Sequence, residues 1–146
     1  MERGLFFFQK HMKHRHLARQ AALQVLTSLL LHKDDEERVI SFVHKECAER
    51  LTQTDFLREL VRGVREHQKE IDEVLQTFAP AWPVEKLDPV ERSVLEMGIF
   101  ELLYTDTPAP VVINEAVDIA KEFGDDTAGK FINGVLSSVA RKHLSK

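Results

Sequence analysis

Apolar residues recur at intervals of three and four along most of this chain, the spacing of helices that bury one face. The first stripe begins after residue 15 and comprises Ala18, Ala22, Val25, Leu26 and Leu29. A second helix, capped by Asp34 or Asp35, carries the shorter stripe Val39, Phe42 and Val43. A third helix is predicted from Thr54 to Leu75. Gly63 lies inside it at a cost of about 1 kcal/mol relative to alanine, which indicates a close helix crossing.

Prolines and capping residues divide the second part of the chain. Residues 79–83 (APAWP) cannot continue a helix, and we interpret them as a hinge between two halves. At residues 88–91 (DPVE) an N-cap, a first-turn proline and a glutamate predict a helix that buries Val94, Leu95, Ile99 and Leu102. A further helix ends at Phe123, with Gly124 as its left-handed terminator. Asp125 or Asp126 caps the last helix, which buries Ile132, Val135, Leu136 and Val139.

These elements predict an all-α fold, because no strand pair or hairpin turn interrupts the helical pattern. We expect six or seven helices in two small packed bundles. Residues 1–12 are predicted to be a flexible extension, followed by a single helical domain over residues 13–146 with halves 13–79 and 84–146. A chain of 146 residues has room for one such domain.

Charge is distributed unevenly along the chain. Residues 1–19 contain five Lys or Arg side chains against one Glu, a net charge of +4, so the remainder carries −8. A basic arm on an acidic body is typical of proteins with separate nucleic-acid and protein contacts. The longest apolar run, residues 5–8, is too short to span a membrane or to serve as a secretion signal. We therefore expect a cytoplasmic protein without membrane contact.

The sequence offers little for catalysis or metal binding. It has no glycine-rich phosphate loop, nucleophile elbow or His-Glu-x-x-His pair, so we expect no enzyme and no cofactor. Cys47 is the single cysteine, which excludes an internal disulfide and a cysteine-rich metal site. His11, His14 and His16 lack a nearby carboxylate or thiolate to complete a metal shell, and we interpret them as part of a cationic segment.

The basic arm is the best candidate for nucleic-acid binding. Arg15 and Arg19 are four residues apart, so on a helix both guanidinium groups project from one face toward phosphates or unpaired bases. Lys13 and His16 extend this patch. Near the other end of the chain, an exposed Phe131 beside Lys130 would stack on a base while the lysine reaches a phosphate. Phe131 also falls on the side of Val135, so the residues alone leave a core position for its ring open.

Five segments in the order and spacing found here resemble the NusB family of bacterial transcription antitermination factors. They are residues 16–26 (HLARQAALQVL), 90–95 (VERSVL), 100–102 (FEL), 113–124 (INEAVDIAKEFG) and 130–136 (KFINGVL). The resemblance extends over most of residues 13–140.

The resemblance implies a two-bundle helical protein without catalytic activity. Family members bind the single-stranded boxA element of nascent ribosomal RNA together with ribosomal protein NusE, and they join other Nus factors on RNA polymerase to suppress termination. By analogy RNA contacts fall on Arg15, His16, Arg19, Gln24, Lys130 and Phe131, and the resemblance moves Phe131 toward an exposed or half-exposed ring. The acidic body would complement basic NusE, with Glu91 and Leu95 on the docking face.

The chain departs from the family pattern in its arm, where histidines stand among the arginines and Thr27 occupies a position that is often aromatic. Fewer permanent charges predict weaker RNA binding, or binding that strengthens as histidines are protonated. Two alternatives remain open at this point. One is an accessory RNA- or protein-binding module for a separate enzyme that modifies ribosomal RNA, and the other is a module that binds proteins alone. A homodimer through residues 5–8 is also left open.

Overall fold

The computed structural model describes the backbone of residues 2–46 and 54–144, and within these ranges the side chains from His14 onward except those of residues 44, 46 and 54. Cys47 therefore lies outside the described residues. The described ranges form seven α-helices and one short 3-10 helix, and they contain no strand. The predicted all-α class is confirmed. The elements are α1 (Glu2–Leu31), α2 (Glu36–Glu46), α3 (Thr54–Glu66), α4 (Gln68–Phe78), η1 (Val84–Lys86), α5 (Pro89–Tyr104), α6 (Ala109–Phe123) and α7 (Asp126–Leu144).

The chain divides into two compact units, residues 1–61 and 62–146. The boundary lies inside α3, so our placement of the hinge at residues 79–83 differs from the division that the structure has. The prolines there do end α4, but α4 packs against η1, α5 and α7 and so belongs to the same unit as the helices that follow. A proline break ends a helix without separating its packing partners.

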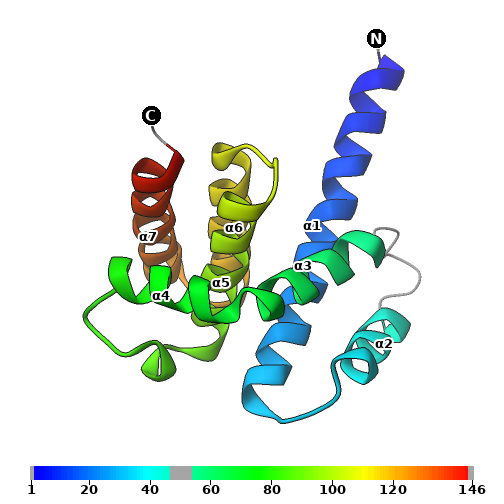
Figure 1. Cartoon of the computed structure of the whole chain (residues 1–146). Helices are drawn as coiled ribbons and strands as arrows, with labels where there is room; N and C mark the ends of the chain where they lie inside the picture. The colour runs from blue at the N-terminus through cyan, green and yellow to red at the C-terminus, as the bar shows by residue number, and fades with distance from the viewer. Residues whose placement is uncertain (1, 47–53, 145–146) are drawn as a thin grey trace. The chain divides into compact units, whose positions relative to one another are not determined.

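The first unit is built on α1, with α2 packed beside it (Figure 1). Ala18, Ala22, Val25 and Leu26 of α1 are buried, as the stripe predicts. Helix α1 begins at Glu2, so residues 2–12 continue the helix that we expected to begin near residue 15, and their flexibility stays a prediction. Nothing in residues 2–12 breaks a helix apart from Gly4, whose cost is small near a terminus.

Helix α2 buries two of the three residues of its predicted stripe. Val39 and Val43 are in the core, whereas Phe42 is 65% exposed, and its assignment to the core is therefore wrong. Phe42 and Val43 are adjacent, so their side chains point about 100° apart on a helix of 3.6 residues per turn. The buried face of α2 is formed by Val39, Ile40 and Val43, and Phe42 lies outside it.

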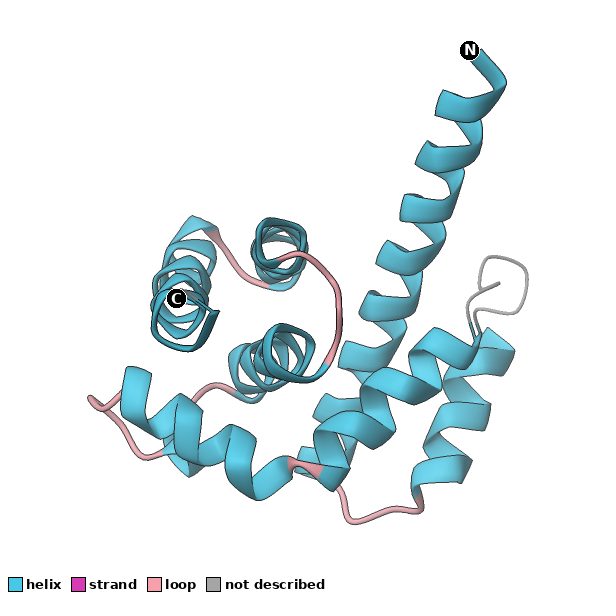
Figure 2. Ribbon diagram, turned by 45° about the horizontal axis from the view of Figure 1, so that its top comes forward, coloured by secondary structure: helices cyan, strands magenta, loops and turns pink. Residues whose placement is uncertain are grey.

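The second unit is organised around α5, in which every residue from 93 to 102 is buried. A helix buried on all sides must be enclosed by others, and α4, α6 and α7 pack around it. Figure 2 shows α5, α6 and α7 nearly end-on, side by side. Gly63, at the end of α3 that belongs to this unit, lies against Phe100 of α5. A Cβ added there would be 2.1 Å from the Phe100 Cζ, so the predicted close crossing is confirmed.

Aspartates begin three of the helices, as predicted. Asp88 accepts hydrogen bonds from the backbone N–H groups of Val90 and Glu91 at 3.1 and 3.0 Å. Asp35 and Asp125 accept in the same way from Arg38 and Ala128. These bonds satisfy N–H groups that a first turn leaves without partners.

Two expected helix ends differ from the structure. Gly124 follows α6 with φ −139°, so it is not a left-handed terminator. The single helix expected over residues 54–75 is two helices, α3 and α4, separated at His67, where φ is −107° and ψ is 19°. The His67 ring stacks on Tyr104 with centroids 3.9 Å apart. Neither proline nor glycine marks this break, so hydrophobic spacing alone could not reveal it.

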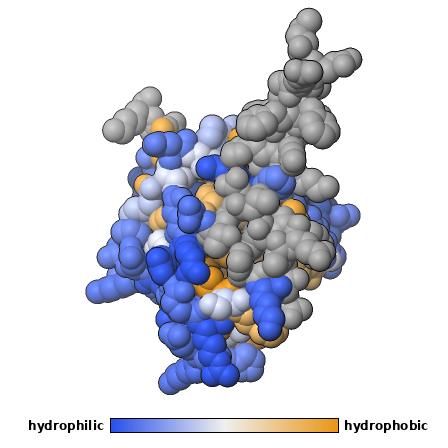
Figure 3. All heavy atoms as spheres, turned by 90° about the vertical axis from the view of Figure 1, so that its right-hand side faces the viewer, coloured by the Kyte–Doolittle hydropathy of each residue, from blue (hydrophilic) through white to orange (hydrophobic). Residues whose placement is uncertain are grey.

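No described helix combines the length and the apolar character that crossing a membrane requires. On the face shown in Figure 3, hydrophilic residues predominate and hydrophobic residues form small patches among them.

Candidate functional site

Two arginines of α1 stack on one aromatic ring of α3. The guanidinium carbons of Arg15 and Arg19 lie 4.4 and 5.0 Å from the centroid of the buried Phe56 ring. The prediction that these arginines share a helix face is therefore confirmed. A ring face is negative in its quadrupole, so it attracts both cations and holds their planar groups in place. Such stacking helps to fix the position of both guanidinium groups.

The two arginines differ in their access to solvent. Arg19 is only 3% exposed, so the direct phosphate contact that we expected from its spacing does not fit this arrangement. Arg15 is half-buried: its Nε is inaccessible and makes no hydrogen bond, and no described carboxylate pairs with its guanidinium. Arg15 is therefore a positioned cation whose remaining N–H groups can serve an anionic ligand.

The other predicted contacts of α1 lie on the same helix. His16 is half-buried and Gln24 is exposed two turns further along the helix. Lys13 lies in α1, but its side chain is outside the described residues. These positions are compatible with a polar surface along α1, and their roles stay predictions.

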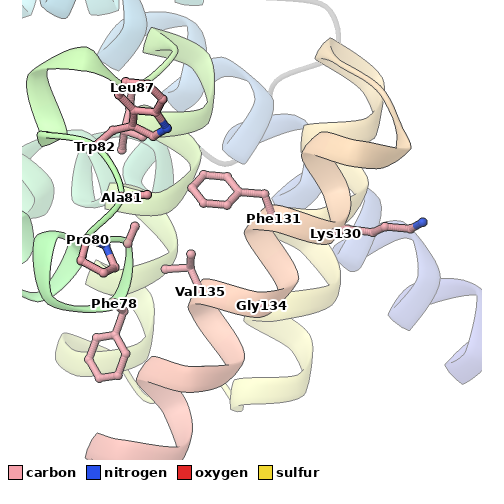
Figure 4. A pocket seen from close by; sticks show the side chains of 10 residues that line it. Phe78, Pro80, Ala81, Trp82, Leu87, Lys130, Phe131, Gly134 and Val135 are labelled. Atoms are coloured by element: carbon pink, nitrogen blue, oxygen red, sulfur yellow. The ribbon is translucent and has the colours of Figure 1, made fainter.

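Lys130 and Phe131 lie in the first turns of α7, beside a cleft of about 520 Å³. Lys130 is exposed and Phe131 is half-buried. Figure 4 shows the Phe131 ring directed toward the loop that carries Ala81 and Trp82, with the Lys130 ammonium directed away from it. The cleft is walled by α7 on one side and by residues 78–87 on the other. The half-buried ring matches the position that the family resemblance implies.

One glutamine holds the loop across the cleft. The Gln76 Nε2 donates to the carbonyl oxygens of Ala79 and Trp82 at 3.4 and 3.0 Å. Its Oε1 accepts from the backbone N–H of Val84 at 3.1 Å. Three backbone groups of a loop without regular structure are thereby satisfied by a single side chain. Trp82 is consequently held in place at its backbone although its side chain is 65% exposed.

The predicted protein-docking residues have different environments. Glu91 is half-buried, and its pKa is raised above the usual value by burial and then by the charges of Asp88 and Asp125. Leu95 is fully buried within α5, so its assignment to an exposed docking face is wrong. The two residues are four positions apart, but every residue of α5 from 93 to 102 is buried, so Glu91 reaches the surface and Leu95 does not.

A buried ionic cluster connects α4 and α5. Glu96, 1% exposed, accepts hydrogen bonds from Gln68 and from the Arg92 guanidinium, the latter at 3.3 Å. Arg92 also pairs with Asp72 at 3.3 Å. Burial, together with the nearby Asp72, raises the pKa of Glu96 to about 8, although Arg92 acts in the opposite direction. The cluster thus joins two helices through one cation and two acidic groups.

The described residues contain no group of three or more His, Cys, Asp or Glu side chains arranged to hold a metal ion. The side chain of His11, one member of the histidine segment, lies outside them. The cleft at Phe131 has an almost wholly apolar lining.

Two residues that complete these sites were not identified from the sequence. Phe56 lies within the helix predicted from Thr54, but its contact with arginines 37 or more positions away depends on how α3 packs against α1. Trp82 was interpreted only as part of a proline break. A lone tryptophan between two prolines, where no helix can bury it, was the available signal.

Comparison with known proteins identifies the family to which this chain is similar. The model of the NusB family matches residues 16–141. The transcription antitermination protein NusB of Oceanobacillus iheyensis is 41% identical over 126 residues, 86% of this chain and 97% of that protein. The protein of the same name from Chloroflexus aggregans is 39% identical over 142 residues, 90% of each.

A solved structure shares the arrangement of helices as well. A chain in the crystal structure of antitermination factors NusB and NusE in complex with dsRNA matches with a TM-score of 0.80 and 29% identity, over 90% of this chain and 98% of that one. The family model, the relatives and the helical architecture agree over most of the sequence, and this chain belongs to the NusB family.

Proposed function

We propose that this protein binds single-stranded boxA-type RNA in nascent ribosomal transcripts together with ribosomal protein NusE, and so suppresses premature termination. It acts in the cytoplasm without catalysing a reaction, and it reaches RNA polymerase through the other Nus factors. The family relatives support this function, since they carry the name of transcription antitermination proteins. A related chain was solved in a complex of NusB, NusE and dsRNA.

The observation that carries the RNA-binding part is the stack of Arg15 on Phe56. A guanidinium held 4.4 Å from a buried ring, with no described carboxylate as partner, keeps its charge available at a fixed place. Arg19 shares the ring and is buried, so it positions the stack instead of contacting phosphate. Lys13, His16 and Gln24 line the same helix and supply the neighbouring contacts. Lys130 and Phe131 contact another part of the strand.

The protein-binding part is assigned to the acidic surface at Glu91. Glu91, Asp88 and Asp125 are close enough for their charges to raise the pKa of Glu91, so this surface concentrates negative charge. A basic ribosomal protein placed there would relieve the mutual repulsion of the three carboxylates. Residues 62–146 as a whole contain 10 Lys or Arg against 15 Asp or Glu, a net charge of −5.

A salt titration of RNA binding tests the role of Arg15. Arg15→Ala is expected to weaken binding of a boxA oligonucleotide and to flatten the log–log salt dependence by about 0.7, the value for one phosphate contact on a single strand. Arg38→Ala is the matched control, because Arg38 is an exposed arginine that pairs with Asp34 at 3.8 Å. Unchanged affinity and slope for Arg15→Ala would remove this residue from the site.

An electrophoretic mobility shift with and without NusE tests the partner. We expect the ternary complex to be tighter than either binary one, and Glu91→Lys to weaken NusE binding while the chain still binds RNA alone. A chain that binds NusE but no RNA in either condition would support the module that binds proteins alone.

A further inference from the structure

The cleft beside Phe131 contains a second aromatic side chain that the proposed function has not used. Trp82 and Phe131 line it from its two walls, the loop after α4 and the start of α7. Both walls belong to the same compact unit. Since indole and phenyl faces are the surfaces on which nucleobases stack, two of them on one cleft are a candidate base site.

We propose that this cleft binds one unpaired nucleobase of the RNA, with Trp82 and Phe131 as its stacking surfaces. The inference rests on the proposed function and adds to it a defined subsite. Its volume, about 520 Å³, lies within the range of about 300–1,000 Å³ typical of small-ligand pockets, so a base with part of its sugar can enter.

The cleft is built before any ligand arrives. Trp82 is 65% exposed, which for an isolated tryptophan on a free loop would mean a side chain without a defined place. Here Gln76 holds the loop at three backbone groups, one of them the carbonyl of Trp82 itself. Gly134 leaves open space at the opposite wall, since a Cβ added there would meet nothing within 4 Å. A loop backbone that is already in position loses less entropy when a base stacks on the ring that it carries.

The lining chemistry favours a base over the apolar side chain of a protein partner. Lys130 is the one charged residue of the lining, and Figure 4 shows its ammonium directed away from the cleft, so it leaves the interior uncharged and can contact a phosphate outside it. The other lining residues are glycine, alanine, proline and larger apolar or aromatic residues. No lining side chain except the indole and the lysine can hydrogen-bond to a base edge, so the subsite recognises the flat ring and not its identity.

The fluorescence of Trp82 gives a direct test, because it is the single tryptophan of the chain. A boxA oligonucleotide is titrated into the full-length protein, with and without NusE, and the signal of Trp82→Leu under the same conditions is subtracted. We expect quenching that follows the binding curve measured by anisotropy of labelled RNA. Trp82→Leu and Phe131→Leu are each expected to weaken binding by about 5- to 150-fold. Phe42 is an equally exposed aromatic residue outside the cleft, so Phe42→Leu should leave the RNA affinity unchanged.

An abasic scan of the oligonucleotide identifies the inserted base. One abasic position should abolish the quenching and reduce the affinity as much as Trp82→Leu does. Trp82→Leu tested with that abasic oligonucleotide should bind no more weakly than either change alone. Replacing that base by another should reduce the affinity far less than removing it. Thermal melts of both variants separate a lost stack from a lost fold, and Trp82→Leu should melt close to the unchanged protein.

The remaining outcomes overturn the inference in distinguishable ways. RNA binding without quenching, and with Trp82→Leu at unchanged affinity, would overturn the subsite and leave the proposed function intact. Quenching by NusE in the absence of RNA, with Trp82→Leu weakening that complex alone, would assign the cleft to a protein partner. No RNA binding by the unchanged protein, with or without NusE, would overturn the proposed function and the subsite together.

Discussion

The guanidinium of Arg15 lies 4.4 Å from the centroid of the Phe56 ring, although the two residues are 41 positions apart in the chain. The same ring holds Arg19 at 5.0 Å. A hydrophobic residue of α3 thus sets the position of cations on α1. The electrostatic surface of the arm therefore depends on an uncharged side chain.

Phe56→Leu is expected to weaken RNA binding without changing its salt dependence, because every charge remains while the stack is lost. Loss of the two cation–π contacts and of part of the ring's packing should lower the free energy of unfolding by about 1–3 kcal/mol. Phe56→Tyr keeps the ring and serves as the control. Anisotropy titrations at several salt concentrations and chemical denaturation measure both effects. A flattened salt slope for Phe56→Leu would contradict this expectation and show that Arg15 loses its phosphate contact altogether without the ring.

Gly63→Ala should destabilise the second unit, because the new Cβ would lie 2.1 Å from the Cζ of Phe100. Overpacking of this kind costs about 1–3 kcal/mol, which outweighs the gain of roughly 0.5–1 kcal/mol from replacing a helical glycine by alanine. Gly134→Ala is the matched control, since its Cβ meets nothing within 4 Å and only the gain remains. Urea unfolding of the two variants should therefore give shifts of opposite sign.

Glu96 makes stability depend on pH. Its pKa is raised to about 8 in the folded protein from an ordinary value of 4.5, so the folded state retains a proton that the unfolded state has released. The resulting stabilisation is complete below about pH 4.5 and is lost as the pH rises through about 8, a change on the order of a few kcal/mol. Glu96→Gln should remove this slope, because an amide does not titrate. Unfolding free energies between pH 5 and pH 9 (about the range in which the two protonation states exchange) measure it. An equal slope in both proteins would contradict the assignment.

Asp88 has two separable effects. Asp88→Ala removes the cap of α5 and should cost about 1 kcal/mol. Asp88→Asn keeps an oxygen for the cap but removes the charge that helps to raise the pKa of Glu91, so that pKa should fall toward its usual value. NMR titration of the Glu91 carboxyl and thermal melts distinguish the two. If Asp88→Asn left the Glu91 titration unchanged, burial and the charge of Asp125 would account for the raised pKa without Asp88.

The sequence determined the local features of the protein. Hydrophobic spacing predicts the buried faces of α1, α5 and α7, and the aspartates at positions 35, 88 and 125 predict three helix starts, since both signals operate within a few residues. Residues 113–124 and 130–136 carried much of the resemblance that identified the NusB family from the sequence. The four-residue spacing of Arg15 and Arg19 predicted that they share a helix face, because this signal too operates within a few residues.

Tertiary structure decided everything that depends on which elements meet. It separated α3 from α4 at His67, where no breaker residue stands, and it buried Leu95 because helices enclose α5 from all sides. It placed Phe56 beneath the arginines and made Trp82 and Phe131 walls of one cleft. A stripe indicates that a face is buried but not what covers it, because packing partners are chosen by the geometry of the whole unit and not by neighbours in the chain.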